Sequence, residues 1–124
     1  MQHATSGDGT LIAFHQVGNG APVVILGGAF STASAGAALA AVLAGAGLRG
    51  VAVDRRARGN SGDTAPYLPA REVEDLAAVI NAIGGEAAVI GHSSGAVLAL
   101  FAARAPACWR CSGTRRCGTC LRPW

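Results

Sequence analysis

The chain has 124 residues and a mass of 12.3 kDa, with 51% hydrophobic and 14% charged residues, which excludes an intrinsically disordered protein. Ala and Gly together supply 45 residues and Lys is absent, so most apolar side chains are small, and the single domain that fits this length has a thin core. Residues 1–107 carry a net charge of −1 and residues 108–124 one of +4, so the pI of 9.0 reflects the carboxyl-terminal tail and indicates no nucleic-acid partner.

Three strands are expected in the first 26 residues. Residues 3–6 and 10–17 flank Gly7-Asp8-Gly9, in which the Asp-Gly pair favours the positive φ angles of a tight hairpin turn. Residues 22–26 (PVVIL) form a continuous apolar run that ends at Gly27, as is typical of a strand buried on both faces of a sheet. The sequence therefore predicts an antiparallel hairpin followed by a central strand.

A helix and a fourth strand follow the central strand. Residues 31–48 are rich in Ala, and Leu39, Val42 and Leu43 recur at helical spacing, which predicts a helix that packs these side chains on the sheet. Residues 50–54 (GVAVD) predict the fourth strand, and residues 55–67 a polar, Gly-rich loop.

Two adjacent cations, Arg55 and Arg56, begin this loop. They are candidates for binding an anionic substrate, but charged pairs in polar loops are mostly solvated or paired with nearby acids. Asp54 and Asp63 are acids close to them in sequence. We therefore favour solvated or ion-paired arginines over a substrate site.

The second helix has the clearest pattern in the chain. It begins at Pro69, which suits a first helical turn, and ends at Gly84-Gly85. Apolar side chains at i, i+3, i+4 and i+7 predict one buried stripe, formed by Val73, Leu76, Ala77 and Ile80. Acidic side chains near its amino end suit the helix dipole, and these are Glu72, Glu74 and Asp75.

A fifth strand, a sharp turn and a third helix complete the pattern. Residues 87–90 predict the strand, residues 91–95 the turn and residues 96–104 the helix, which Pro106 ends. Strands that alternate with helices imply right-handed crossovers within one sheet. We expect an α/β fold with a mostly parallel sheet and helices on both faces.

The predicted turn at residues 91–95 has the sequence Gly-His-Ser-Ser-Gly and fits the pattern G-x-S-x-G between a strand and a helix. The reversal is so tight that only small residues fit two positions before and after the serine, which accounts for Gly91 and Gly95. Ser93 is then expected in a strained conformation, with its hydroxyl exposed near the amino end of the helix. The bare pattern also arises by chance in a Gly-rich chain, but its place between strand and helix favours a nucleophile elbow.

Four segments precede the elbow segment AAVIGHSSGAVLAL. In chain order they are the opening hairpin GDGTLIAFHQVG, the central strand and its loop VVILGGAF, the next strand and its loop VAVDRRARGNSGDT, and the helix REVEDLAAVINAIGG. With this order, residues 8–107 resemble the α/β-hydrolase family. The resemblance implies that Ser93 is the nucleophile of a serine hydrolase, which acts on a small ester or related acyl substrate without a cofactor. It also implies an oxyanion hole formed by the backbone N–H groups of Ala29 and Ser94.

The catalytic triad of the family is incomplete in this sequence. Its order is serine, acid and histidine, and no His, Asp or Glu follows Ser93. His3 and His15 belong to the opening hairpin, which the family fold places at the far edge of the sheet, and Asp63 belongs to the loop after the fourth strand. We therefore expect residues 1–107 to be the amino-terminal half of a hydrolase domain, truncated after the fifth strand and the elbow helix, and inactive.

His92 precedes the nucleophile, which makes it a second candidate for the base. Its position in the turn does not easily bring the imidazole onto the hydroxyl of the next residue. We favour a structural role for His92, in which it packs or forms hydrogen bonds beneath the elbow.

The tail, residues 108–124, holds all four cysteines as two C-x-x-C pairs: Cys108, Cys111, Cys117 and Cys120. Four thiolates are the ligand count of a tetrahedral zinc site, although only five residues separate the pairs, and C-x-x-C also occurs in redox dithiols. Out-of-frame translation of GC-rich DNA yields the same Arg, Cys, Trp, Gly and Pro composition. We favour a frameshift-derived tail without structure or metal, and keep a non-catalytic domain with a zinc-binding tail as the alternative.

Two expectations concern location and partners. The amino end lacks the basic segment and apolar run of a signal peptide, and no apolar run is long enough to span a membrane, so we expect a cytoplasmic protein without a membrane partner. The family fold pairs the fifth strand with a sixth that is missing here. Its open edge predicts self-association and marginal stability.

Overall fold

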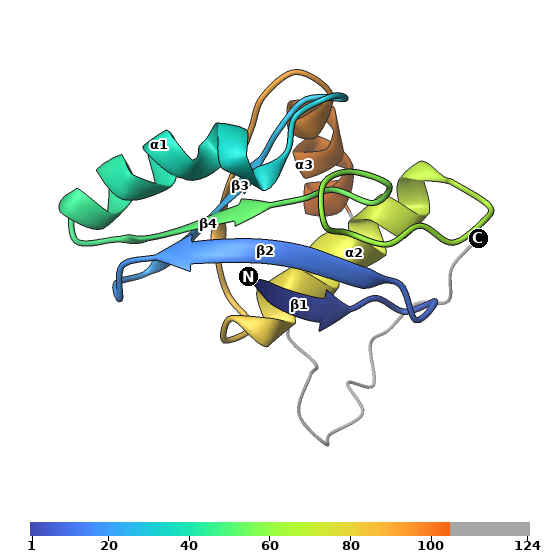
Figure 1. Cartoon of the computed structure of the whole chain (residues 1–124), viewed down its shortest axis with the longest axis horizontal. Helices are drawn as coiled ribbons and strands as arrows, with labels where there is room; N and C mark the ends of the chain where they lie inside the picture. The colour runs from blue at the N-terminus through green and yellow to red at the C-terminus, as the bar shows by residue number, and fades with distance from the viewer. Residues whose placement is uncertain (105–124) are drawn as a thin grey trace.

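The computed structural model describes residues 1–104, in which five strands and three helices alternate (Figure 1). The strands are β1 (Gln2–Thr5), β2 (Leu11–Val17), β3 (Pro22–Leu26), β4 (Arg49–Val53) and β5 (Ala88–Gly91). The helices are α1 (Ala33–Gly45), α2 (Pro69–Ala82) and α3 (Ser94–Arg104). Every element expected from the sequence is confirmed, with ends shifted by three residues or fewer. None of these three helices is long and apolar enough to cross a lipid bilayer.

The five strands form one mixed sheet in the order β1-β2-β4-β3-β5. β1 pairs with β2 and β2 with β4 in antiparallel fashion, whereas β3 pairs with β4 and with β5 in parallel. The expected mostly parallel sheet is therefore confirmed, with an antiparallel hairpin at one edge. The parallel strands β4, β3 and β5 end at the same edge of the sheet, where their following loops meet.

The hairpin between β1 and β2 closes as its Asp-Gly pair predicts. Gly9 has a φ of +85°, and Asp8 Oδ1 accepts a hydrogen bond of 3.0 Å from the N–H of Thr10. Two backbone hydrogen bonds close the turn: Ser6 N–H donates to the Thr10 carbonyl, and Gly9 N–H donates to the Ser6 carbonyl. The side chain of Asp8 thus takes the place of a backbone acceptor, as Asp often does in turns.

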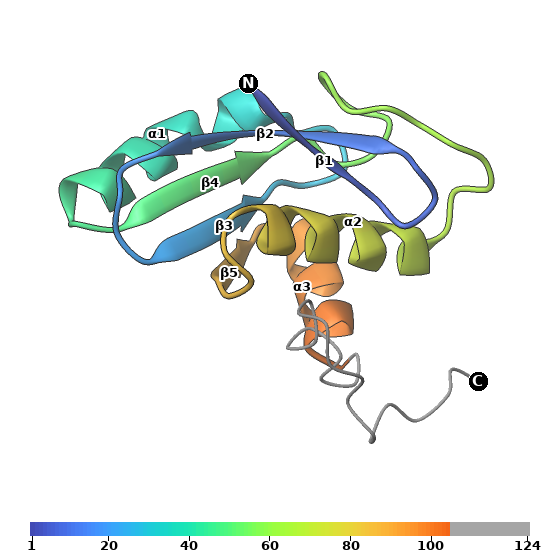
Figure 2. The same ribbon diagram turned by 90° about the horizontal axis from the view of Figure 1, so that it is seen from below.

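The helices lie on both faces of the sheet, with α1 on one face and α2 and α3 on the other (Figure 2). The main apolar core lies between the sheet and α2 and α3. Its members come from four strands and both helices, and include Ile12, Phe14, Val24, Leu26, Val51, Val53, Leu76, Val79, Ile80, Ile83 and Leu98. The core therefore lies on the face that also carries the start of α3.

α1 packs on the sheet through small residues, which corrects the expected apolar stripe. Leu39 and Val42 are exposed, while Ala33 and Ala40 are buried. A Cβ atom added to Gly50 of β4 would lie 2.7 Å from the carbonyl oxygen of Ala40. The helix backbone therefore lies directly on β4, and this close approach leaves no room for large side chains between them.

α2 buries two carboxylates near its amino end, where the sequence predicted only that acidic side chains suit the helix dipole. Glu72 and Asp75 are 4% and 5% exposed. They share one helix face with the buried apolar residues Leu76, Val79 and Ile80, whereas Val73 and Ala77 of the expected stripe are half-buried. Compared with the predicted stripe, the buried face of α2 is rotated toward Glu72 and Asp75, because each of these carboxylates has an arginine partner in the core.

β5 forms one edge of the sheet. Within residues 1–104 it pairs with β3 alone, and its Ala88 and Ile90 are exposed, whereas β3 and β4 have four buried residues each. The open edge expected at the fifth strand is therefore present in the described part of the chain.

The close packing of α1 on β4 predicts the effect of two glycine substitutions. Gly50→Ala places a methyl group against the backbone of Ala40 and is expected to lower the free energy of unfolding by about 1–3 kcal/mol. Gly45→Ala in α1 meets no atom within 4 Å and is expected to raise it by about 0.5–1 kcal/mol. Urea denaturation followed by circular dichroism measures both, and a neutral Gly50→Ala would contradict the packing.

Candidate active site

Ser93 lies between β5 and α3 in a left-handed backbone conformation. Its φ is 55°, and within residues 1–104 Ala57 is the other non-glycine residue with a positive φ. The turn is closed by bonds of 3.0 Å from Gly95 N–H to the His92 carbonyl and of 2.9 Å from Ala96 N–H to the Ser93 carbonyl. The Ser93 side chain is exposed, so the strained and accessible conformation expected from the motif is present.

Both glycines of the motif are required by close backbone contacts. A Cβ atom on Gly91 would lie 2.5 Å from the amide nitrogen of Ala96, and one on Gly95 would lie 2.6 Å from the carbonyl oxygen of Gly27. The first contact is within the turn and the second is with the loop after β3. Glycine at these positions lets the turn fold tightly and seats α3 on the neighbouring strand end.

The loop after β3 lies beside Ser93. A Cβ atom on Gly28 would lie 3.4 Å from Ser93 Cβ and 3.7 Å from Ser93 Oγ. The carbonyl of Gly28 accepts a bond of 3.2 Å from the Ser31 N–H. Within residues 1–104, no acceptor takes up the N–H of Ala29 or of Ser94. Two backbone donors are thus available at the two sides of Ser93.

The histidines lie in different places. His92 is exposed, with Nδ1 3.6 Å from the position of a Cβ on Gly28, so the expectation that it packs beneath the elbow is wrong. His3 and His15 lie on β1 and β2, and β4 and β3 separate β2 from β5, as expected. Asp63 is exposed in the loop after β4. Among the residues described, none of these side chains forms a hydrogen bond with Ser93.

Arg55 connects the elbow to α2. It is 6% exposed, and its Nε and Nη2 donate bonds of 2.6 and 2.7 Å to the two carboxylate oxygens of Glu72. Its Nη1 donates to the Gly27 carbonyl at 3.0 Å and to Ser94 Oγ at 2.8 Å. Of the interpretations favoured from the sequence, an ion-paired Arg55 is therefore confirmed, whereas a solvated Arg55, or one paired with Asp54 or Asp63, is wrong.

Arg56 forms a second buried ion pair. It is fully buried and donates bonds of 2.9 and 2.8 Å to Asp75 and one of 2.7 Å to Asp8 of the hairpin turn. Its partners, like that of Arg55, come from distant parts of the sequence. One sequence signal could have indicated both ion pairs: the i, i+3 spacing of Glu72 and Asp75 places two acids on one face of α2.

Asp54 is buried without an arginine partner. Its Oδ1 accepts a bond of 2.6 Å from the Ala33 N–H at the start of α1, and its Oδ2 one of 2.9 Å from the Asn60 N–H. A carboxylate at a helix amino end is stabilised by the unpaired N–H groups and the helix dipole. Asp54 therefore fixes the loop after β4 relative to α1.

The ion pairs shift the pKa values of the buried groups. Burial raises the pKa of the Glu72 carboxyl, but the hydrogen bonds from Arg55 and Tyr67 outweigh this effect and bring the pKa below its usual range. The hydrogen bond from Arg56 holds the pKa of Asp8 well below its usual range. Glu72 and Asp8 are therefore charged at neutral pH.

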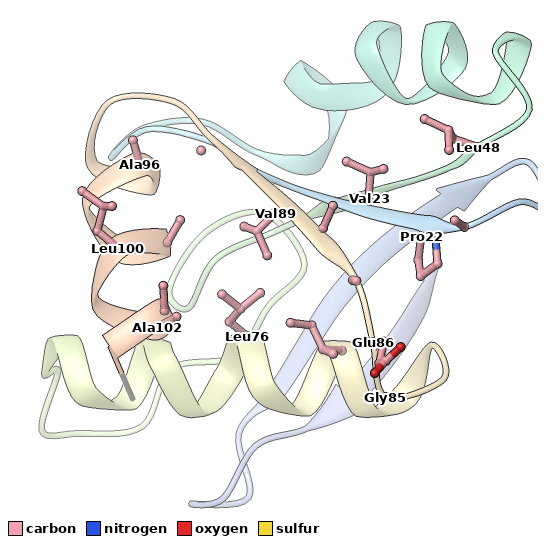
Figure 3. A pocket seen from close by; sticks show the side chains of 17 residues that line it. Pro22, Val23, Leu48, Leu76, Gly85, Glu86, Val89, Ala96, Leu100 and Ala102 are labelled. Atoms are coloured by element: carbon pink, nitrogen blue, oxygen red, sulfur yellow. The ribbon is translucent and has the colours of Figure 1, made fainter. Parts of the chain in front are cut away.

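A groove of about 1280 Å³ runs along the free edge of β5 and the adjoining side of α3 (Figure 3). Its lining is mostly apolar and includes Val23, Leu76, Val89, Ala96 and Leu100, while Ser93 is not part of it. The groove thus meets the turn at Gly91 and extends from there along β5 and α3. Residues 1–104 hold no group of three His, Cys, Asp or Glu side chains that would bind a metal. The four cysteines of the predicted tail, Cys108, Cys111, Cys117 and Cys120, lie outside the described residues.

The chain combines a mostly parallel sheet that has helices on both faces with a glycine-bounded serine turn between a strand and a helix, the arrangement of an α/β-hydrolase fold. The profile of the alpha/beta hydrolase family matches residues 18–121. The chain therefore belongs to the α/β-hydrolase family. The match begins later and runs further than the resemblance over residues 8–107, and it includes most of the tail segment. A comparison with curated protein sequences gave no match.

Several solved structures are similar to the chain, each over 82% of its length. An alpha/beta hydrolase from Sphaerobacter thermophilus is 56% identical, with a TM-score of 0.79, and the chain covers 39% of it. An esterase from Exiguobacterium antarcticum is 28% identical (TM-score 0.76, 38% covered). An epoxide hydrolase from an endophytic Streptomyces is 29% identical (TM-score 0.77, 32% covered). The chain thus spans less than half the length of these proteins.

The lowered pKa values of Glu72 and Asp8 predict a loss of stability in acid. In the unfolded chain these carboxyls titrate near 4. Since both folded pKa values lie lower, their contribution is complete above about pH 5 and is lost as the pH falls through the unfolded and then the folded values. Urea midpoints measured from pH 7 to pH 3 should stay level above about pH 5 and then fall.

Two variants locate the origin of this acid sensitivity. Glu72→Gln removes one of the two carboxylates and should give a shallower fall in the urea midpoint. Glu86→Gln changes an exposed carboxylate outside the network and should leave the fall unchanged. An identical pH profile for Glu72→Gln and the unmodified chain would contradict the assignment.

Proposed function

We propose that this chain carries the nucleophile half of a serine hydrolase, in which Ser93 attacks a small ester or related acyl substrate. The observation that carries the proposal is the exposed Ser93 with a φ of 55°, held beside the loop that contains Ala29. The esterase from Exiguobacterium antarcticum, 28% identical to the chain, supports an acyl substrate. Two N–H donors beside the serine also suit an acyl carbon, whose oxygen becomes an anion when attacked.

In the proposed reaction, Ser93 Oγ forms a bond to the acyl carbon and the carbonyl oxygen takes up the negative charge. The N–H groups of Ala29 and Ser94 donate hydrogen bonds to this oxygen, and the amino end of α3 adds its dipole. The bond to the leaving group then breaks and leaves an acyl-enzyme, which water hydrolyses. The serine proton passes to a base and from it to the leaving group.

No base for Ser93 is found among residues 1–104. No His, Asp or Glu follows Ser93 in the sequence, and none of those before it forms a hydrogen bond with Ser93 in the described part of the chain. A hydroxyl without a base is a weak nucleophile, and the loss of a triad member leaves about 10³ to 10⁴-fold catalysis over water. We therefore propose that the 124-residue chain by itself is an inactive form, in which Ser93 reacts slowly and turnover is no faster than that of Ser93→Ala.

Covalent labelling tests the role of Ser93. A fluorophosphonate probe in excess should label the folded chain slowly, at one site, with the adduct on Ser93, because the oxyanion hole stabilises the charged phosphonyl oxygen. Intact-mass and peptide mass spectrometry measure the stoichiometry and the site.

The controls are Ser93→Ala and the urea-unfolded chain, neither of which should be labelled at this rate. Hydrolysis of p-nitrophenyl acetate by the unmodified chain should equal that of Ser93→Ala. Labelling that persists in Ser93→Ala would overturn the assignment of the nucleophile, and Ser93-dependent turnover would overturn the proposed inactivity.

Within residues 1–104 the outer edge of β5 has no strand partner, and this supports a second proposal, that two copies of the chain associate there. The backbone of Ala88–Gly91 faces outward on one side, and the adjoining α3 exposes Val97, Leu100 and Phe101. Such an unpaired, apolar edge is a template for pairing with another strand. A second copy offers the same edge, which makes the contact self-complementary.

Sedimentation velocity tests this association with a matched pair of variants. Leu100 lines the groove beside β5 and Val42 lies on α1 at the other face of the sheet, and both are 68% exposed. The unmodified chain should sediment as a dimer or larger species as its concentration rises. Leu100→Lys should shift it to a monomer, and Val42→Lys should have no effect. A chain that is monomeric at every concentration would contradict the proposal.

A further inference from the structure

The Arg55 guanidinium contacts both sides of the proposed oxyanion hole. Nη1 donates to the carbonyl of Gly27, two residues before Ala29, and also to Oγ of Ser94, whose own N–H is the second proposed donor. These contacts are 3.0 and 2.8 Å long, so one nitrogen atom holds the loop after β3 and the start of α3 together.

The guanidinium is itself held by Glu72. Two parallel hydrogen bonds of 2.6 and 2.7 Å fix its plane, and Tyr67 donates a further bond to the same carboxylate. Such a bidentate pair restricts both the distance and the orientation of the arginine. Glu72 is 4% exposed, so bulk solvent has little access to the pair. The position of Nη1 is therefore set by α2.

A second arginine holds the far end of the same loop. Arg58 Nε donates to the carbonyl of Ala29, and Arg58 Nη1 lies 3.9 Å from Glu72 Oε2. Between the two arginines, the Gly28 carbonyl accepts the bond from Ser31 N–H. In a trans peptide the N–H points opposite to the preceding carbonyl, so this bond sets the direction of the Ala29 N–H. Three successive carbonyls of the loop are thus fixed, two of them by arginines that share Glu72.

We propose that Arg55 and Glu72 are positioning residues of the oxyanion hole, which fix the separation and direction of the Ala29 and Ser94 N–H groups. The proposal rests on the proposed function, since it assumes that these two donors bind the oxyanion. Neither side chain touches the substrate. Their effect is transmitted through the Gly27 carbonyl and the Ser94 hydroxyl, and a shift of the donors by an ångström is enough to weaken catalysis strongly.

Arg56 provides the matched control for this role. It is the next residue, it is also buried, and it also forms two hydrogen bonds with a carboxylate of α2. Its remaining partners are Asp8 and the carbonyl of Thr64, and it contacts neither Gly27 nor Ser94. Loss of either arginine removes two hydrogen bonds from a buried carboxylate and destabilises the fold, but only the loss of Arg55 releases the donors.

The test compares Arg55→Met with Arg56→Met in two measurements on the chain. The first is the rate of Ser93 labelling by the fluorophosphonate, per folded molecule, with the folded fraction taken from circular dichroism. Arg55→Met should lower this rate about tenfold to a hundredfold, and Arg56→Met should leave it within about twofold of the unmodified chain. The second is the position of the Ala29 and Ser94 amide resonances in ¹H–¹⁵N spectra without probe, which only Arg55→Met should move.

The outcomes separate this proposal from the proposed function. If the unmodified chain is not labelled at Ser93, the proposed function fails, and the amide resonances still decide whether Arg55 positions the two N–H groups. Equal effects of the two substitutions on the resonances, or unmoved resonances in Arg55→Met, would overturn the positioning role. Slower labelling in Arg56→Met, equal to that in Arg55→Met, would overturn it as well.

A milder variant covers the case in which Arg55→Met does not fold. Ser94→Ala keeps the backbone N–H and the buried ion pair but removes the hydroxyl that Arg55 holds. It should shift the Ser94 amide resonance and slow Ser93 labelling about threefold to tenfold, less than the loss of a whole donor. Unchanged resonances and an unchanged rate in Ser94→Ala would overturn the proposal.

Discussion

The two buried ion pairs between the loop after β4 and α2 are the constraint on which the rest of the structure depends. Arg55 with Glu72 and Arg56 with Asp75 each form two hydrogen bonds in the core. Removal of charges from water is costly, so such pairs add little net stability, but removal of one partner typically costs about 3–5 kcal/mol. Their effect is to specify geometry, because α2 has only one position in which both carboxylates are satisfied.

This geometry is concentrated at one edge of the sheet. The parallel strands β3, β4 and β5 end together, and the loops that follow them carry the Gly27–Ala29 segment, the arginines and Ser93. In open α/β sheets, the carboxyl ends of the strands are where ligands bind. The polar groups of the site are thus joined through short side-chain and backbone contacts, while the apolar core lies further along the same strands.

Much of the fold could be predicted from local sequence, and the exceptions have a common cause. The strand at residues 22–26, the Asp-Gly turn and the strained Ser93 follow from local patterns that the structure repeats. The buried face of α1 could not be predicted, because burial there is decided by the backbone approach to Gly50 and not by side-chain size. Ion pairing of Arg55 and Arg56 was among the favoured interpretations, but their partners and the exposure of His92 could not be predicted, because these depend on residues, or on space, elsewhere in the sequence.

The φ of 55° at Ser93 lowers the free energy of unfolding, and it occurs at the residue whose hydroxyl is the proposed nucleophile. For a residue with a Cβ atom, a left-handed conformation costs about 1–2 kcal/mol, and glycine at the same place is free of this cost. A chain selected only for thermal stability would therefore drift toward glycine at position 93 and lose its hydroxyl. In directed evolution, a screen for thermostability alone would therefore select against Ser93, the proposed nucleophile.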